Sequence, residues 1–470
     1  MQARKVLLIQ IGLILFALVG SGISLTLPSG GYDIYWFYLP IIYAVMVFLC
    51  PEHIRLALKN VGMCVFAIVI FVRYVVVPLL FSLSEGSDGY ILRKPSDGSA
   101  NTAFFLLAGE LVFSLLLVKL LHKKMYLRPA EAIACTREVE CLTHYTVLLS
   151  VVFVATSMLL YKPEILLRYN FFIIYDAIDR IVYDWPLSGL FLVVVDFLLF
   201  VPALILLSYL KRKYDKSNSI HYFVASLLIV LPFMLVFKGV SRFSVLVPTI
   251  AWMVVLLRLY PQYKKFSMAL VGAVAVSVFI SITLYKHYGQ TQAEVGVSSF
   301  NVDEAAFLGN AYFSGLYNMA YAVEVGDNLS FSDSYYRLYN DVFANLALLS
   351  GLADKATTSS ADFNYRIYGI EGKVDQIIPM SGQGYIYFGP VFSFLVLLIS
   401  VYLLMFVDSA LARANKIEYI FAYSFMSIYF AMSMMLSFNS IYPLMFNVVG
   451  PLLVLFYFNR RTFFYKRTGI

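Results

Sequence analysis

The sequence predicts an all-α polytopic membrane protein with about twelve transmembrane helices. Of its 470 residues, 61% are hydrophobic and only 13% are charged, and the apolar residues gather in long runs. A run of about 20 such residues is the length that a helix needs to cross a bilayer. The predicted helices occupy residues 6–27, 34–50, 61–84, 101–121, 144–161, 187–210, 221–237, 243–257, 266–285, 384–406, 419–438 and 443–458.

The charges predict how these helices are oriented. Cytosolic loops of membrane proteins are rich in Lys and Arg, and an N-terminus on the inside assigns 22 of the 35 Lys and Arg residues to that side. Arg4 and Lys5 precede the first apolar run without a cleavage site, which indicates an uncleaved signal anchor. Both chain ends are therefore expected in the cytosol.

This topology divides the chain into three regions. Residues 1–285 form a nine-helix membrane region with a smaller outer segment at 162–186, and residues 384–470 form a three-helix membrane region. Between them, residues 286–383 are predicted to be a large, partly helical extracytoplasmic loop. Its helices are expected at 303–325 and at 333–350, with Ser332 or Asp333 as the N-cap of the second and Gly351 at its end. They are expected to lie on the membrane surface or to re-enter it.

Three charged residues fall inside predicted spans, where a charge is costly. Arg73, Glu110 and Asp196 lie midway along the third, fourth and sixth helices. They could form a proton or ion relay, as in a transporter, or a buried ion pair that fixes helix packing. Because Arg73 and Glu110 lie at matching depth on consecutive antiparallel spans, the sequence favours a structural pair.

A short polar turn at Lys238–Arg242 joins the seventh and eighth helices at the outer face. Ser241 and Arg242 stand where the positive end of the eighth helix dipole points, which suits a phosphate. The alternative is that Lys238 and Arg242 simply extend to the lipid headgroups. A glycine-rich stretch, Ser381–Gly389, is predicted to open the tenth helix. Its Gly382 and Gly384 allow close approach of a ligand or close helix packing.

A base for proton transfer is expected in the outer segments. His287 follows Lys286 and precedes Tyr288 at the end of the ninth helix, and a histidine there could act near neutral pH. The competing carboxylates are Asp176, Asp179, Asp184, Asp303 and Glu304. Further cations that could contact a diphosphate are Arg337, Lys355, Arg366 and Lys373. The loop tyrosines could stack on sugars or form an interfacial aromatic belt.

Several classes of function are disfavoured. The chain lacks a Walker loop, a dinucleotide fingerprint, an HExxH motif and a serine-hydrolase elbow. The spacing of Cys135 and Cys141 does not suit zinc, so neither a metal nor a cofactor is expected. The net charge of +7 is not gathered in a dense basic run, so nucleic acid is not an expected partner.

The order of these motifs resembles the Wzy-type polymerases of bacterial O-antigen, capsule and related polysaccharides. The resemblance covers residues 230–405 and is carried by Gly239–Arg242, Lys286–Gly289 and Ser381–Gly389. It implies a GT-C-like, metal-independent glycosyltransferase in the bacterial cytoplasmic membrane that uses undecaprenyl diphosphate-linked oligosaccharides. A chain-length regulator and a flippase of the same pathway would be partners.

The resemblance also assigns roles to the residues at those motifs. His287 and Arg242 would be catalytic, as base and as stabiliser of the leaving diphosphate. The residues that would contact diphosphate or sugar are Lys238, Ser241, Lys286, Tyr288, Arg337, Arg366, Gly382 and Gly384. Two alternatives stay open at this point: an O-antigen ligase, which shares the architecture, and a flippase or other transporter of lipid-linked oligosaccharides.

Overall fold

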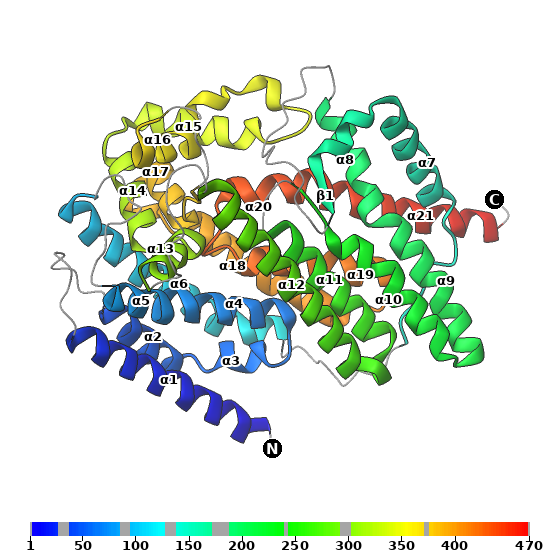
Figure 1. Ribbon diagram of the computed structural model, residues 1–470, viewed down its shortest axis with the longest axis horizontal. Coiled ribbons are helices and arrows are strands. Elements are labelled where there is room, and N and C mark those ends of the chain that lie inside the picture. The colour runs from blue at the N-terminus through cyan, green and yellow to red at the C-terminus, as the bar shows by residue number, and fades with distance from the viewer. Residues whose placement is uncertain are drawn as a thin grey trace.

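The computed structural model shows an almost entirely helical chain (Figure 1). It describes residues 2–26, 37–84, 95–126, 138–171, 188–238, 243–291, 302–370 and 376–468. Helices dominate because a chain in lipid must satisfy every backbone N–H and C=O within itself. Six helices are long and apolar enough to cross a membrane: Arg4–Thr26, Val61–Leu83, Asp97–Tyr126, Ser188–Ser217, Leu395–Arg413 and Phe438–Arg461.

A seventh span is possible where two apolar helices, Phe243–Leu259 and Pro261–Val274, meet at a bend of 118°. The four remaining apolar helices of the described chain are shorter: Tyr38–Leu49, Thr146–Tyr161, Ile220–Leu235 and Ile417–Ala431. At 1.5 Å per residue, helices of 12 to 16 residues fall short of a 30 Å hydrocarbon core. The protein is thus an all-α membrane protein, and the described part of its chain contains six or seven helices of spanning length.

The N-terminal part packs as one group of helices. Its elements are α1 (Gln2–Thr26), α2 (Tyr38–Leu49), α3 (Glu52–Ala57), α4 (Val61–Phe71), a π-helical stretch (Val72–Val76), α5 (Val77–Leu83) and α6 (Asp97–Tyr126). The start of α4 is held from far along the chain. The buried carboxylate of Asp408 accepts hydrogen bonds from the amides of Gly62 (3.2 Å) and Met63 (3.1 Å), which satisfies two of the four free amides of that helix end.

The middle of the chain adds more helices and the two strands of the described structure. These are α7 (Thr146–Tyr161), β1 (Tyr169–Phe171), α8 (Ser188–Asp196), α9 (Val201–Ser217), α10 (Ile220–Leu235), β2 (Val236–Lys238), α11 (Phe243–Leu259) and α12 (Lys264–Thr291). The strands pair antiparallel, with Tyr169 opposite Lys238. The pairing places residues 169–171, which belong to the smaller predicted outer segment, beside residues 236–238, and the sequence did not indicate this contact.

The segment that the sequence predicts to lie outside, residues 286–383, is called the outer segment below, and its described part between residues 302 and 370 folds into four α-helices at one end of the bundle. They are α13 (Val302–Phe313), α14 (Leu316–Asp327), α15 (Phe331–Ala344) and α16 (Ser359–Tyr368). α13 packs on α5, and α14 packs on α6. The start of α1 and the end of α21 lie away from this group (Figure 1). Helix α15 carries a side-chain cap, because the Ser330 hydroxyl accepts a hydrogen bond from the Asp333 amide (3.2 Å).

The last part of the chain contains α17 (Met380–Phe392), α18 (Leu395–Arg413), α19 (Ile417–Ala431), α20 (Phe438–Leu444), a π-helical stretch (Met445–Val449) and α21 (Gly450–Thr468). α18 packs on α6 and α19. The core of the molecule lies where these helices meet α4, α6 and α14.

Three predicted boundaries were wrong. The helix expected at 303–325 is broken at Ser314, whose φ of 48° is left-handed, and at Gly315. The helix expected at 333–350 begins after the cap Ser330 and ends at Ala344, so neither Ser332 nor Asp333 is its cap and Gly351 is not its end. The stretch Ser381–Gly389 does not open the tenth helix, because it forms the separate helix α17.

Candidate functional site

The turn that was predicted to bind phosphate lies largely outside the described residues. Lys238 ends β2, and α11 begins at Phe243, so Ser241 and Arg242 immediately precede a helix N-terminus along the chain. The structure describes neither residues 239–242 nor the side chain of Lys238. The phosphate role of this turn therefore stays a prediction.

The predicted base also stands on a segment whose side chains are not described. Lys286, His287 and Tyr288 were expected at the end of the ninth helix, but α12 continues to Thr291. The three residues therefore lie within its last two turns. Their proposed contacts with substrate stay predictions.

Two predicted diphosphate ligands are paired with carboxylates. Arg337 Nε lies 2.8 Å from Asp362 Oδ2, and Arg366 Nε lies 2.7 Å from Glu324 Oε2. Glu324 also accepts a hydrogen bond from the Ser96 amide (2.6 Å), which ties α14 to the start of α6. These pairs join helices of the outer segment, so a diphosphate would have to compete with carboxylates for both cations.

The glycines of α17 serve close packing within the protein. A Cβ on Gly384 would overlap the carbonyl oxygen of Ser393, and a Cβ on Gly382 would lie 2.7 Å from Ala322 Cβ. The chain can fold back in this way because Gly389 adopts a φ of +70°, which favours glycine. Of the two roles that the sequence left open for these glycines, the structure supports close packing.

The predicted pairing of Arg73 with Glu110 is confirmed. Arg73 Nη2 lies 2.6 Å from Glu110 Oε1, and both side chains are fully buried. Arg73 also donates to the carbonyl oxygens of Phe313 (2.8 Å) and Met434. Arg73 lies midway along the span Val61–Leu83. It therefore links the break between α13 and α14 to the turn between α19 and α20.

Two further hydroxyl groups complete the surroundings of this pair. Tyr74 donates to Glu110 Oε1 (2.5 Å), and Ser381 of α17 donates to Glu110 Oε2. Asp196 is a separate site, since its Oδ1 accepts a hydrogen bond from the Tyr169 hydroxyl (2.5 Å). The pair therefore anchors the outer segment and α17 inside the bundle.

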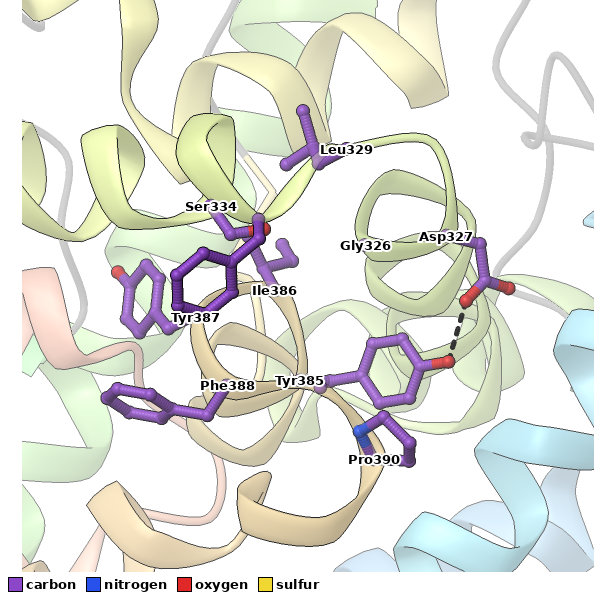
Figure 2. A pocket seen from close by; sticks show the side chains of 11 residues that line it. Gly326, Asp327, Leu329, Ser334, Tyr385, Ile386, Tyr387, Phe388 and Pro390 are labelled. Atoms are coloured by element: carbon purple, nitrogen blue, oxygen red, sulfur yellow. Dashed lines mark hydrogen bonds between the residues drawn. The ribbon is translucent and has the colours of Figure 1, made fainter.

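A pocket opens where the outer segment meets α17 (Figure 2). It has a cavity volume of about 220 Å³ and is lined by Gly326, Asp327, Leu329, Phe331, Ser334 and residues 385–390. Tyr385 donates a hydrogen bond to Asp327 Oδ1 (2.6 Å), drawn as the dashed line in Figure 2. Phe331, which begins α15, is 87% exposed at this site. The pocket thus combines aromatic rings with one carboxylate and hydroxyl groups.

Behind one wall of the pocket lies a buried carboxylate, Asp341 of α15. Its Oδ2 accepts hydrogen bonds from Tyr387 Oη (2.5 Å) and the Ser359 amide (3.1 Å), and its Oδ1 accepts one from Asn439 Nδ2 (2.6 Å). Gln383 joins the same network by donating to the Tyr387 oxygen (3.1 Å). The network connects α15, α16, α17 and α20, so it fixes the wall that Tyr387 contributes to the pocket.

Asp341 gives this region an expected dependence on pH. Burial raises the pKa of Asp341, against the hydrogen bonds that lower it. The folded protein then holds the proton more tightly than the unfolded chain, so stability should fall as the pH rises from about 4, the ordinary carboxyl pKa, through the raised value. Thermal unfolding in detergent across this range measures the slope, and Asp341→Asn should flatten it.

Asp333 on the same helix provides the control. Its carboxyl is exposed, and a hydrogen bond from Ser330 lowers its pKa, so it contributes in the opposite direction, with stability lost as the pH falls. Asp333→Asn should therefore leave the Asp341-dependent slope in place. A slope that Asp341→Asn does not change would contradict a role for this carboxyl.

The sequence did not single out Asp327, Tyr385, Tyr387 or Asp341. The two tyrosines lie inside the glycine-rich stretch, and the pattern of glycines followed by tyrosines there could have indicated these two residues as site candidates. Asp341 falls on a polar helix face that is normally exposed to solvent, and only the tertiary structure shows that this face is buried. Within the described part of the chain, no group of three or more His, Cys, Asp and Glu side chains could hold a metal ion.

Comparisons with protein-family models, with curated proteins and with solved structures find no match for this chain.

Proposed function

We propose that this chain is a membrane glycosyltransferase that joins undecaprenyl diphosphate-linked oligosaccharides into a surface polysaccharide. The reaction would take place at the outer face of a bacterial cytoplasmic membrane. The complete bundle would then hold about twelve spans in a GT-C-like arrangement, with the shorter apolar helices among them. The motifs that resemble the Wzy-type polymerases motivate this proposal.

The observation that carries the proposal is the position and lining of the pocket. It lies between helices of the polar outer segment and α17, and α17 leads directly into the apolar span α18. Phe331, Tyr385 and Phe388 offer aromatic rings that can stack on a sugar ring, while Asp327 can accept hydrogen bonds from sugar hydroxyls. A site with this lining, next to a helix of spanning length, suits a sugar that is attached to a lipid.

The proposed reaction makes one glycosidic bond and breaks one bond to phosphate. A hydroxyl oxygen of the acceptor sugar attacks the anomeric carbon of the donor, and its proton passes to a base. The bond between that carbon and the diphosphate oxygen breaks, and undecaprenyl diphosphate leaves with the electron pair. Cations would stabilise the leaving group, a role that the sequence assigns to Arg242 with Lys238 and Lys286.

Asp327 is a further candidate for the base, beside His287 and the carboxylates that the sequence offers. Its carboxylate lies in the pocket and is oriented by Tyr385. General-base catalysis typically contributes about 10²–10⁴-fold to a rate, so Asp327→Asn should lower polymerisation by about that factor if Asp327 takes the proton. His287→Ala, measured in the same assay, separates the two candidates. Asp333→Asn, at an exposed position in the first turn of α15, should keep normal activity.

The decisive experiment incubates the purified protein with lipid-linked repeat units. Ladders of longer chains together with released undecaprenyl diphosphate are the expected products. Arg242→Ala should insert normally and leave single repeat units, and normal ladders in that variant would contradict the diphosphate role. When lipid A-core is supplied as well, transfer to lipid A-core alone would identify a ligase. Movement of the lipid across a vesicle without ladders would identify a flippase.

A further inference from the structure

An exposed apolar face leads away from the pocket. Phe388 lines the pocket, and it is followed by Val391 and Phe392, which are 78% and 61% exposed. Apolar side chains as exposed as these would be unfavourable in water. Helix α18 begins three residues after Phe392 and is of spanning length, so we expect residues 388–392 at the boundary of the lipid.

Helix α18 continues the same apolar face. Leu395, Ile399, Tyr402 and Phe406 are all exposed, and their spacing of four, three and four residues places them on one side of the helix. The buried residues of α18, Leu397, Val401 and Leu404 among them, belong to the core shared with α6 and α19. An apolar stripe therefore runs from the rim of the pocket along the span.

We propose that this stripe, residues 391–406 of α17 and α18, binds the isoprenoid chain of the lipid-linked substrate while its sugar occupies the pocket. The pocket lining holds a carboxylate and no cation, so it suits sugar hydroxyls better than a diphosphate. The diphosphate then lies between the pocket and the stripe, at the surface of the bilayer. The identity of the lipid rests on the proposed function.

The stripe differs from other lipid-facing surfaces of the described helices because it ends at a polar pocket. Ile68 of α4 and Val276 of α12 are also exposed apolar residues on helices of the bundle, but they do not lead to this pocket. Bulk phospholipid would contact all three surfaces equally. A specific amphiphile held by its head would contact only the stripe on α18.

Photo-crosslinking of the full-length protein can test this difference. A photoreactive phenylalanine analogue is placed at Ile399, at Ile68 or at Val276, where exposures of 52%, 56% and 59% tolerate the change. Each variant is reconstituted in phosphatidylglycerol vesicles with a trace of labelled undecaprenyl diphosphate-linked sugar. Labelling at Ile399 should be about tenfold higher than at the other sites, the factor that ~1.4 kcal/mol of preference gives.

The competitor identifies the ligand. Excess unlabelled lipid-linked sugar should abolish the preference for Ile399, whereas further phosphatidylglycerol should not. Equal labelling at the three positions, or loss of the preference with phosphatidylglycerol, would overturn the proposal. Crosslinking requires no turnover of the substrate. Preferential labelling at Ile399 in a protein that does not polymerise would therefore support the proposed lipid site and contradict the proposed polymerase activity. Ladders of longer chains without a labelling preference at Ile399 would support the polymerase and reject the proposed lipid site.

Discussion

Glu110→Ala is expected to destabilise the protein by about 3–5 kcal/mol, because it leaves the Arg73 guanidinium buried without a counter-charge. Arginine cannot lose its proton to escape this cost. The same change removes the acceptor of the Tyr74 and Ser381 hydroxyls. Unfolding of the purified protein in mixed detergent micelles measures the effect, together with the amount of protein that reaches the membrane.

Ser114 offers a matched control on the same helix. It lies one turn after Glu110 and is fully buried, and its hydroxyl has no hydrogen-bond partner among the described residues. Ser114→Ala should therefore be neutral or stabilising, because it removes a buried hydroxyl that makes no hydrogen bond. Equal stability of Glu110→Ala and Ser114→Ala would show that the ion pair does not hold the outer segment in place.

Gly384→Ala should have the second largest effect, through the backbone. The new Cβ would overlap the Ser393 carbonyl oxygen, and a carbonyl fixed at a chain reversal cannot move aside as a flexible side chain can. Overpacking of this kind costs typically 1–3 kcal/mol. Because α17 lines the pocket, the variant should also lose glycosyl transfer, and thermal unfolding with the ladder assay measures both losses.

Gly98 in the first turn of α6 is the control for that change. A Cβ there would meet no atom within 4 Å, so Gly98→Ala should be neutral or slightly stabilising, since alanine favours a helix. A Gly384→Ala protein with the stability and activity of Gly98→Ala would contradict the close approach of α17 to Ser393.

The sequence predicted the all-α membrane fold because lipid leaves a chain few alternatives to apolar helices, whereas the number of twelve spans stays a prediction. The pairing of Arg73 with Glu110 was predictable for a related reason, since two opposite charges at one depth in lipid favour contact. Neither argument predicts the residues at which a helix is interrupted. Ser314 adopts a left-handed conformation because its hydroxyl donates to the carbonyl oxygens of Ile377 and Met435, contacts that exist only in the folded protein.

The candidate site was less predictable for two physical reasons. Periodicity places the polar face of α15 in solvent, whereas Asp341 is buried because donors from three other helical segments converge on it. Arg337 and Arg366 were predicted as cations that could contact a diphosphate, whereas the structure pairs them with carboxylates distant in sequence. Tertiary contacts of this kind leave no local pattern in the sequence.

The hydrogen bonds from Gly62 and Met63 to Asp408 have a consequence for biosynthesis. The acceptor is translated 346 residues after its first donor. During synthesis, two amides of α4 therefore lack their hydrogen-bond acceptor until α18 has been made. Arg73 likewise lacks one of its acceptors, the carbonyl oxygen of Met434, until that residue has been made. The early helices can therefore reach their final packing only when the last ones have been made, and a chain interrupted before α18 would leave these hydrogen bonds unformed and the bundle incompletely folded.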